Sequence, residues 1–105
     1  DHIAAVNAEI LGRFAQEAID DGAIPYIVFF PGRRDFAGQE RKHTDLVFSR
    51  LRQKQLHYED LTPCMRRAEY RDLFNEGHFH YSPKGNAVAA ECLIQFLRNG
   101  LAHKT

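Results

Sequence analysis

The spacing of apolar residues predicts that helices and strands alternate along the chain. Residues 2–20 carry apolar side chains three or four positions apart, the stripe of an amphipathic helix: Ile3, Val6, Ile10, Phe14 and Ala18. Gly22 follows as a natural C-cap. Residues 24–30 (IPYIVFF) are almost continuously apolar and rich in β-branched and aromatic side chains. This run predicts a strand buried on both faces, as in a parallel sheet covered by helices.

The rest of the chain repeats this order with weaker signals. Residues 39–54 predict a more polar helix. Within the next stretch, residues 55–63 (QLHYEDLTP), Leu56 and Tyr58 predict a short second strand with Asp60 at its end. A short helix is expected over residues 64–74. The residues expected to face inward in these two helices are Leu46, Val47, Leu51, Met65, Ala68 and Leu73.

The last helix has the clearest start and end signals. Ser82 is a good N-cap, and Pro83 suits the first helical position because its missing N–H would be unpaired there anyway. Asn99-Gly100 marks the expected end. Its apolar face is expected to comprise Val88, Cys92, Leu93, Phe96 and Leu97.

This element order predicts an α/β fold: a partial doubly wound, flavodoxin-like parallel sheet covered by helices, in one unit spanning residues 1–105. Two strands make a poor sheet, since sheets usually have about 4–6 strands. We therefore expect something else to complete the sheet. Either an N-terminal half lies upstream in the natural protein, or a second copy of the chain forms a homodimer.

Composition excludes some functions. Fourteen basic and fourteen acidic residues, counted as Lys+Arg and Asp+Glu, cancel, so no global field favours nucleic acid as a partner. No apolar run approaches the ~20 residues that span a bilayer. Cys64 and Cys92 are the only cysteines, and we expect two thiols that fill the core rather than a disulfide framework. They exclude neither an oxidising nor a reducing compartment.

The loop ahead of the last helix holds the candidate chemistry. Ligands of open α/β sheets bind beyond the carboxyl ends of the strands, and the loop of residues 76–81 should reach that edge. His78 and His80 both lie in this loop. The stretch HYSPKGN (residues 80–86), followed by three alanines before residue 91, resembles the last conserved block of SGNH (GDSL-type) hydrolases. In that block the catalytic histidine precedes a small polar residue by two positions and a glycine by five.

The resemblance spans roughly residues 5 to 98 and implies an SGNH-type sheet with ester hydrolysis or acyl transfer as the activity. In such an enzyme a serine attacks the acyl carbon, and His80 would act as the general base. The implied substrate is a small-molecule, carbohydrate or lipid acyl ester, with no cofactor. The family's Gly-Asp-Ser block is missing from these 105 residues, whose serines are Ser49 and Ser82. The nucleophile would therefore come from sequence outside this chain.

The other candidate site residues surround His80 or follow the first strand. The family commonly has Asp three residues before the histidine, where this chain has Gly77. Glu76, one residue further away, is the candidate for orienting His80. His78 and Arg33 are candidate substrate contacts, with Arg33 suited to an anionic group.

Two alternatives stay open. The chain could be a non-catalytic α/β module that self-associates and keeps the histidine loop as a binding site or a relic. His78 and His80 could instead share a metal ion with Glu76, Asp60 or Cys64. Their spacing matches no standard zinc motif, so we predict no metal site.

Overall fold

The computed structural model describes residues 2–37, 41–77 and 79–102, with only the backbone for residues 101 and 102. The chain divides into two compact units. Unit 1 comprises Asp1–Val28 and Glu40–Glu59, and unit 2 comprises Phe29–Gln39 and Asp60–Thr105. The boundaries between the two units lie after Val28 and after Glu59.

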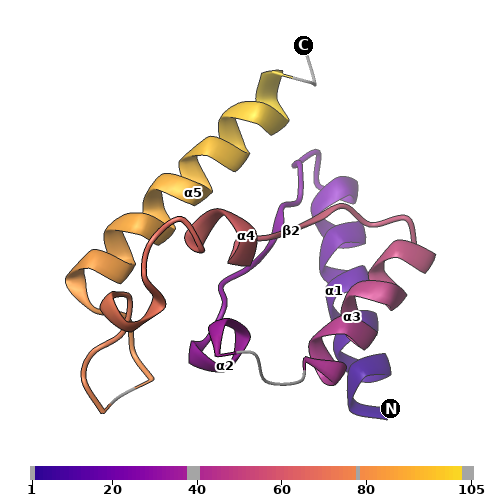
Figure 1. Ribbon diagram of the computed structural model, residues 1–105. Coiled ribbons are helices and arrows are strands. Elements are labelled where there is room, and N and C mark those ends of the chain that lie inside the picture. Colours follow the sequence, from indigo (N-terminus) through magenta and orange to yellow (C-terminus); the bar gives the residue numbers. More distant parts are fainter. Residues whose placement is uncertain (1, 38–40, 78, 103–105) are drawn as a thin grey trace. The chain divides into compact units, whose positions relative to one another are not determined.

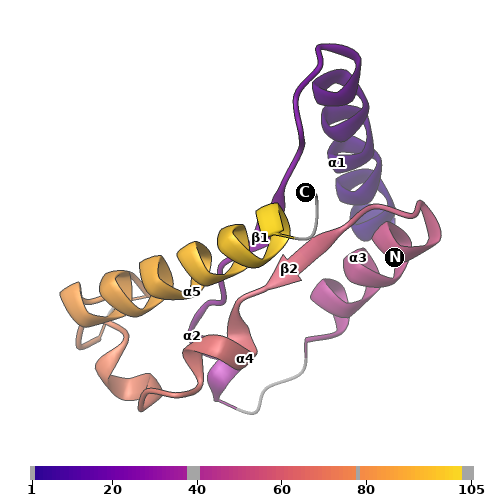
Figure 2. The ribbon, with the colours of Figure 1, turned by 90° about the horizontal axis from the view of Figure 1, so that it is seen from above.

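The α/β class predicted from the pattern is confirmed, in a chain that is mostly helical (Figures 1 and 2). The strands β1 (Ile27–Phe29) and β2 (Tyr58–Asp60) form a two-stranded parallel sheet. The remaining elements, in chain order, are α1 (His2–Asp20), α2 (Arg33–Phe36), α3 (Lys42–Gln53), α4 (Thr62–Met65), the 3-10 turn η1 (Tyr70–Asp72) and α5 (Pro83–Ala102). None of the helices in the described ranges is long and apolar enough to cross a membrane.

In unit 1, α1 packs against α3 through small side chains. The buried residues of α1 are Ala4, Ala8 and Ala15, which lie four or seven positions apart on one face of the helix. Alanine lets two helices approach closely. The buried side chains of α3 are Phe48 and Leu51. The predicted helix over residues 2–20 and its end are confirmed: Gly22 has a φ of +82°, and the backbone N–H of Ala23 donates to the carbonyl of Ala18 at 2.8 Å.

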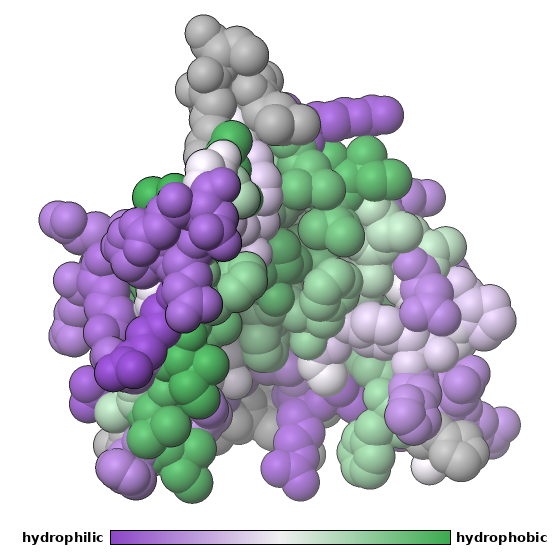
Figure 3. All heavy atoms as spheres, turned by 180° about the vertical axis from the view of Figure 1, so that it is seen from behind, coloured by the Kyte–Doolittle hydropathy of each residue, from purple (hydrophilic) through white to green (hydrophobic). Residues whose placement is uncertain are grey.

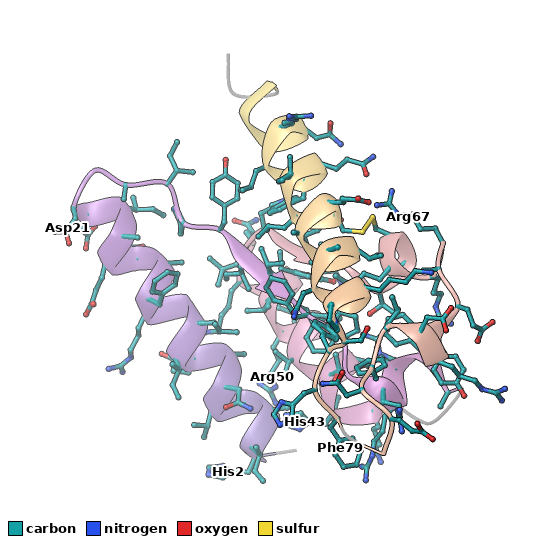
Figure 4. The ribbon with its side chains drawn as sticks, turned by 90° about the vertical axis from the view of Figure 1, so that its left-hand side faces the viewer. His2, Asp21, His43, Arg50, Arg67 and Phe79 are labelled. Atoms are coloured by element: carbon teal, nitrogen blue, oxygen red, sulfur yellow. A yellow bond between two sulfur atoms is a disulfide. The ribbon has the colours of Figure 1, made fainter. Side chains whose placement is uncertain are left out.

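Four of the five side chains in the apolar stripe predicted for α1 lie on its surface, and the fifth, Ala18, is half-buried. Ile3 is 63% exposed, Ile10 59%, Phe14 52% and Val6 42%. Our assignment of the inner face was therefore wrong: the alanines occupy the contact with α3, and the larger stripe lies roughly a third of a turn away. Figure 4 shows side chains of α1 projecting from the ribbon, and Figure 3 shows apolar side chains open to the surface on one face of the molecule.

The strand prediction for residues 24–30 is correct in place and wrong in extent and burial. Only Ile27–Phe29 form β1, and these three residues are half-buried rather than buried on both faces. Ile24 and Phe30 are 50% and 47% exposed. Among the described residues, β1 has one neighbouring strand, so an interior strand by composition is observed in a two-stranded sheet.

In unit 2, one face of α5 forms much of the core. Val88, Cys92 and Phe96 of the predicted apolar face are buried, whereas Leu93 and Leu97 are half-buried and Ala89, outside that prediction, is buried as well. These buried residues share the core of this unit with Phe36, Leu61, Met65, Leu73 and Phe74. The helix begins at Pro83 as expected and continues past Asn99-Gly100 to Ala102. A glycine inside a helix is unfavourable by only about 1 kcal/mol, which the buried face offsets.

The helix expected over residues 64–74 is replaced by α4 and η1. The backbone of Glu69 is extended, with φ −65° and ψ 123°, and this interrupts the helix. Met65 and Leu73, two of the three inner residues that the sequence predicted here, are still buried, and the third, Ala68, is half-buried.

Cys64 and Cys92 form a disulfide between α4 and α5, with a Cα–Cα distance of 5.9 Å (Figure 4). The expectation of two separate core thiols was therefore wrong. The cysteines are 28 residues apart in sequence, and spacing alone could not show that α4 lies against α5.

Reduction of this disulfide should lower the free energy of unfolding by about 3–4 kcal/mol, because the bond closes a long loop of the unfolded chain. Urea unfolding with and without a phosphine reductant measures the difference. The Cys64→Ala/Cys92→Ala double variant is the control, and its unfolding midpoint should not respond to the reductant. An equal midpoint for oxidised and reduced wild type would contradict the bond.

Candidate functional site

The candidate site is built around a tight loop of residues 75–80, which we call the histidine loop. Phe74 and Tyr81 form an antiparallel bridge at its base. The backbone N–H of Asn75 donates to the carbonyl of His80 at 2.9 Å, and Gly77 adopts a φ of +70° within the loop. The His80 side chain is exposed, on a loop whose two ends are fixed by backbone hydrogen bonds.

The residues after His80 fix the start of α5. The Ser82 hydroxyl accepts a hydrogen bond from the backbone N–H of Gly85 at 3.0 Å, as an N-cap does, and donates to the carbonyl of Asp72 at 2.6 Å. A Cβ atom at Gly85 would lie 1.9 Å from the carbonyl oxygen of Leu73, so only glycine fits there. The small polar residue and the glycine that carry the family resemblance therefore each have a packing role in this chain.

The base of the histidine loop is attached to the segment that follows β1. The Tyr81 hydroxyl donates to the carbonyl of Pro31 at 2.5 Å. The Arg33 guanidinium lies 5.6 Å from the centre of the Phe74 ring and donates to the carbonyl of Asn75 at 3.4 Å. The loop thus lies beyond the carboxyl end of β1, where the sequence predicted it.

A hollow of about 690 Å³ opens beside the histidine loop, entirely within unit 2. Two of the predicted site residues, Arg33 and Glu76, line it. The other lining residues are Arg34, Ala37, Tyr70, Arg71, Phe74, Gly77 and Phe79. We refer to this hollow as the arginine pocket, because three arginines contribute to its wall.

The predicted site residues are only partly brought together. His80 belongs to the same loop as Glu76, but it is not part of the wall of the arginine pocket. Among the described residues, no hydrogen bond or ion pair joins the Glu76 carboxylate to the His80 ring, and both side chains are exposed. His78 lies outside the described residues.

Sequence reasoning missed Arg71 and Tyr70 as site residues. Both fall in η1, inside the segment expected to be one helix, which contains three arginines, and nothing in its pattern singled out Arg71. The Arg71 guanidinium lies 5.8 Å from the centre of the Tyr70 ring. The hydrogen bond and charge of Tyr70, with the Glu69 carboxylate, raise the pKa of Arg71, which keeps this group charged.

Two of the residues proposed for the metal alternative, Asp60 and Cys64, have other partners. The Asp60 carboxylate accepts hydrogen bonds from the backbone N–H and the hydroxyl of Thr62, at 3.0 and 2.6 Å. Cys64 is bonded to Cys92. In the part of the chain that the structure describes, no three His, Cys, Asp or Glu side chains gather closely enough to hold a metal ion.

Protein stability should fall at high pH through Tyr81. Burial, and then the negative charge of Asp35, raise the pKa of Tyr81 to about 12. An unfolded tyrosine titrates near pH ~10, so the neutral phenol stabilises the fold fully below that pH. Between about pH 10 and 12 the unfolded chain loses this proton first, and the stability contribution disappears as pH rises through the folded pKa.

The matched variant is Tyr81→Phe, which should lose about 1 kcal/mol at pH 7 with the hydrogen bond to Pro31. Its free energy of unfolding should then fall less steeply than that of wild type between pH 10 and 12. Urea unfolding at a series of pH values measures both slopes. Identical slopes would show that Tyr81 does not carry this pH dependence.

Gly85→Ala should destabilise the protein by more than about 3 kcal/mol, beyond ordinary overpacking, because the added methyl would overlap the Leu73 carbonyl. Gly12→Ala in α1 is the matched control. A Cβ there would lie 3.5 Å from the Lys54 side chain, an ordinary contact, so a gain of up to about 1 kcal/mol is expected. Equal effects of the two substitutions in thermal or urea unfolding would contradict the close approach at Gly85.

Comparison of this chain with protein-family models, curated proteins and solved structures finds no match. The resemblance to SGNH hydrolases therefore rests on the residues of the histidine loop and the start of α5.

Proposed function

We propose that the chain is the histidine-bearing portion of an SGNH-like esterase or acyltransferase, in which sequence outside these 105 residues supplies the nucleophilic serine. In this proposal β1 and β2 belong to a larger, doubly wound parallel sheet. The acid–base chemistry is assigned to His80, with Glu76 as the carboxylate that orients its ring.

The observation that carries the proposal is the attachment of the histidine loop to the end of β1. The bond between the Tyr81 hydroxyl and Pro31 fixes the residue next to His80 at the carboxyl edge of a parallel strand. That edge is where ligands of open α/β sheets bind. The exposed His80 ring, on a loop with a fixed base, suits a proton acceptor that must meet a partner from another segment.

The proposed reaction has two matching halves. His80 takes the proton of the incoming serine hydroxyl as the serine oxygen attacks the ester carbonyl carbon. When the tetrahedral intermediate collapses, the bond to the alcohol breaks and His80 returns the proton to the departing oxygen. A water molecule or another hydroxyl then attacks the acyl-serine, with His80 again as base, and free serine is regenerated. Donors for the oxyanion would come from the segment that carries the serine.

The exposed apolar surface of unit 1 supports a larger sheet. Five large apolar side chains of α1 are 42% to 63% exposed, and β1 has an apolar composition suited to an interior strand. Burying apolar surface is worth about 25 cal/mol per Å², so surface of this kind favours a partner segment. We assign that role to the N-terminal half that would also carry the serine.

Fluorophosphonate labelling of the full-length natural protein tests the proposal. Intact-mass measurement should show one adduct on wild type. His80→Ala should slow labelling and turnover of acyl esters at least about a hundredfold, because a general base contributes at least this much. His2→Ala, which removes an exposed histidine of α1, is the matched control and should react like wild type.

Wild-type turnover in His80→Ala would remove the base assignment. Absence of an adduct on wild type would remove the serine mechanism and favour the second candidate, a non-catalytic module. The same exposed stripe of α1 supports that candidate, since a second copy could cover it in a homodimer. Sedimentation at micromolar concentration then distinguishes a dimer from a monomer.

A further inference from the structure

We infer that the arginine pocket binds an organic oxyanion, a carboxylate or phosphate group attached to an apolar body. The claim that this molecule is the substrate rests on the proposed function; the claim that the pocket binds it does not. The substrate class would then be an acyl ester that carries an acidic group, rather than a neutral lipid or an acetylated sugar.

The wall of the arginine pocket carries a net positive charge. Arg33, Arg34 and Arg71 line the pocket, and Glu76 is the only acidic side chain among the described lining residues. Three cations and one anion leave an excess of positive charge in a protein whose total charge is zero. Guanidinium groups present planar forks of N–H donors that match carboxylate and phosphate oxygens.

The contacts of Arg33 within the protein leave part of its guanidinium group without a hydrogen bond. Its guanidinium lies against the Phe74 ring and gives Asn75 one long hydrogen bond of 3.4 Å. Its Nε atom is buried and has no hydrogen-bond partner among the described residues. An unsatisfied buried donor is unfavourable, so a small rotation toward a bound oxyanion would gain hydrogen bonds that the fold does not supply.

Aromatic side chains also line the arginine pocket. Phe74 is buried beneath the pocket, whereas Phe79 is 76% exposed on the histidine loop (Figure 4). Tyr70 adds a further ring. Bare phosphate would leave these apolar surfaces unused, while a ligand with an apolar body would cover them. Phe79 also brings the pocket to within one residue of His80, as binding of a substrate next to the base requires.

Substitution of Glu76 should change the affinity for an anion in the opposite direction to substitution of the arginines. Its carboxylate repels a bound anion, so Glu76→Gln should strengthen binding severalfold. Arg33→Gln should weaken binding about tenfold or more, because hydrogen bonds to a charged group are lost. Arg34→Gln should also weaken it, and Arg34 is exposed, so this variant keeps the test valid if Arg33→Gln fails to fold. Arg50→Gln, an equal change of charge on the exposed face of α3, should bind like wild type.

Calorimetric titration of the full-length natural protein with phenyl phosphate, phenylacetate, inorganic phosphate and benzyl alcohol tests the inference. Both aromatic anions should bind saturably and more tightly than the other two probes, and added salt should weaken them. Tighter binding of phenyl phosphate than of phenylacetate would assign a phosphate group, and the reverse a carboxylate. Benzyl alcohol binding as well as the anions, or equal affinities of the Arg33→Gln, Arg34→Gln and Arg50→Gln variants, would overturn the site.

The titration is independent of the catalytic proposal. His80→Ala should retain the binding of phenyl phosphate, because His80 is not part of the pocket wall. Binding by a protein that takes no fluorophosphonate adduct would support the pocket and remove the esterase. An adduct on a protein that binds neither aromatic anion would do the reverse.

Discussion

The candidate site depends on the close approach of the first turn of α5 to the carbonyl of Leu73. The backbone of Gly85 lies so near that carbonyl that no other residue fits, and Ser82 joins the same contact through Gly85 and Asp72. Because α5 is fixed there, the Tyr81 hydroxyl reaches the carbonyl of Pro31, and the bridge between Phe74 and Tyr81 closes the histidine loop. A glycine and a serine with packing roles therefore help to place the loop that carries the exposed His80 side chain.

Two further ties hold unit 2 around this contact. The disulfide joins α4 to the middle of α5, and the Tyr81 hydroxyl joins the base of the histidine loop to the end of β1. Between these ties the chain buries Met65, Leu73 and Phe74. The core of the unit is buried, whereas the charged and aromatic side chains of the histidine loop are exposed. Proteins commonly carry their binding residues on loops that a packed core supports.

Unit 1 illustrates a different constraint. Its helices meet through alanines, so the contact between α1 and α3 is close, and the larger apolar side chains of α1 are left on the surface. An apolar stripe on a helix indicates a face that is suited to burial, but it does not identify the segment that covers this face. In α1 two adjacent faces are apolar, one small and one large, and the described structure covers the small one. The large face is the physical reason for expecting a further segment or a second copy.

Local sequence determined the elements with strong local signals. The helix of residues 2–20, its glycine cap, the Ser82-Pro83 start of α5 and the positions of both strands follow from periodicity and capping, which act within a few residues. Long-range contacts decided the rest. The disulfide, the choice of buried face on α1 and the grouping of Arg33 with Arg71 depend on residues that are far apart in sequence, and no local spacing encodes that proximity. The histidine loop lies between these cases: its sequence led to the proposed chemistry, whereas the hydrogen bond from Tyr81 to Pro31, a contact across 50 residues, decided where the loop is placed.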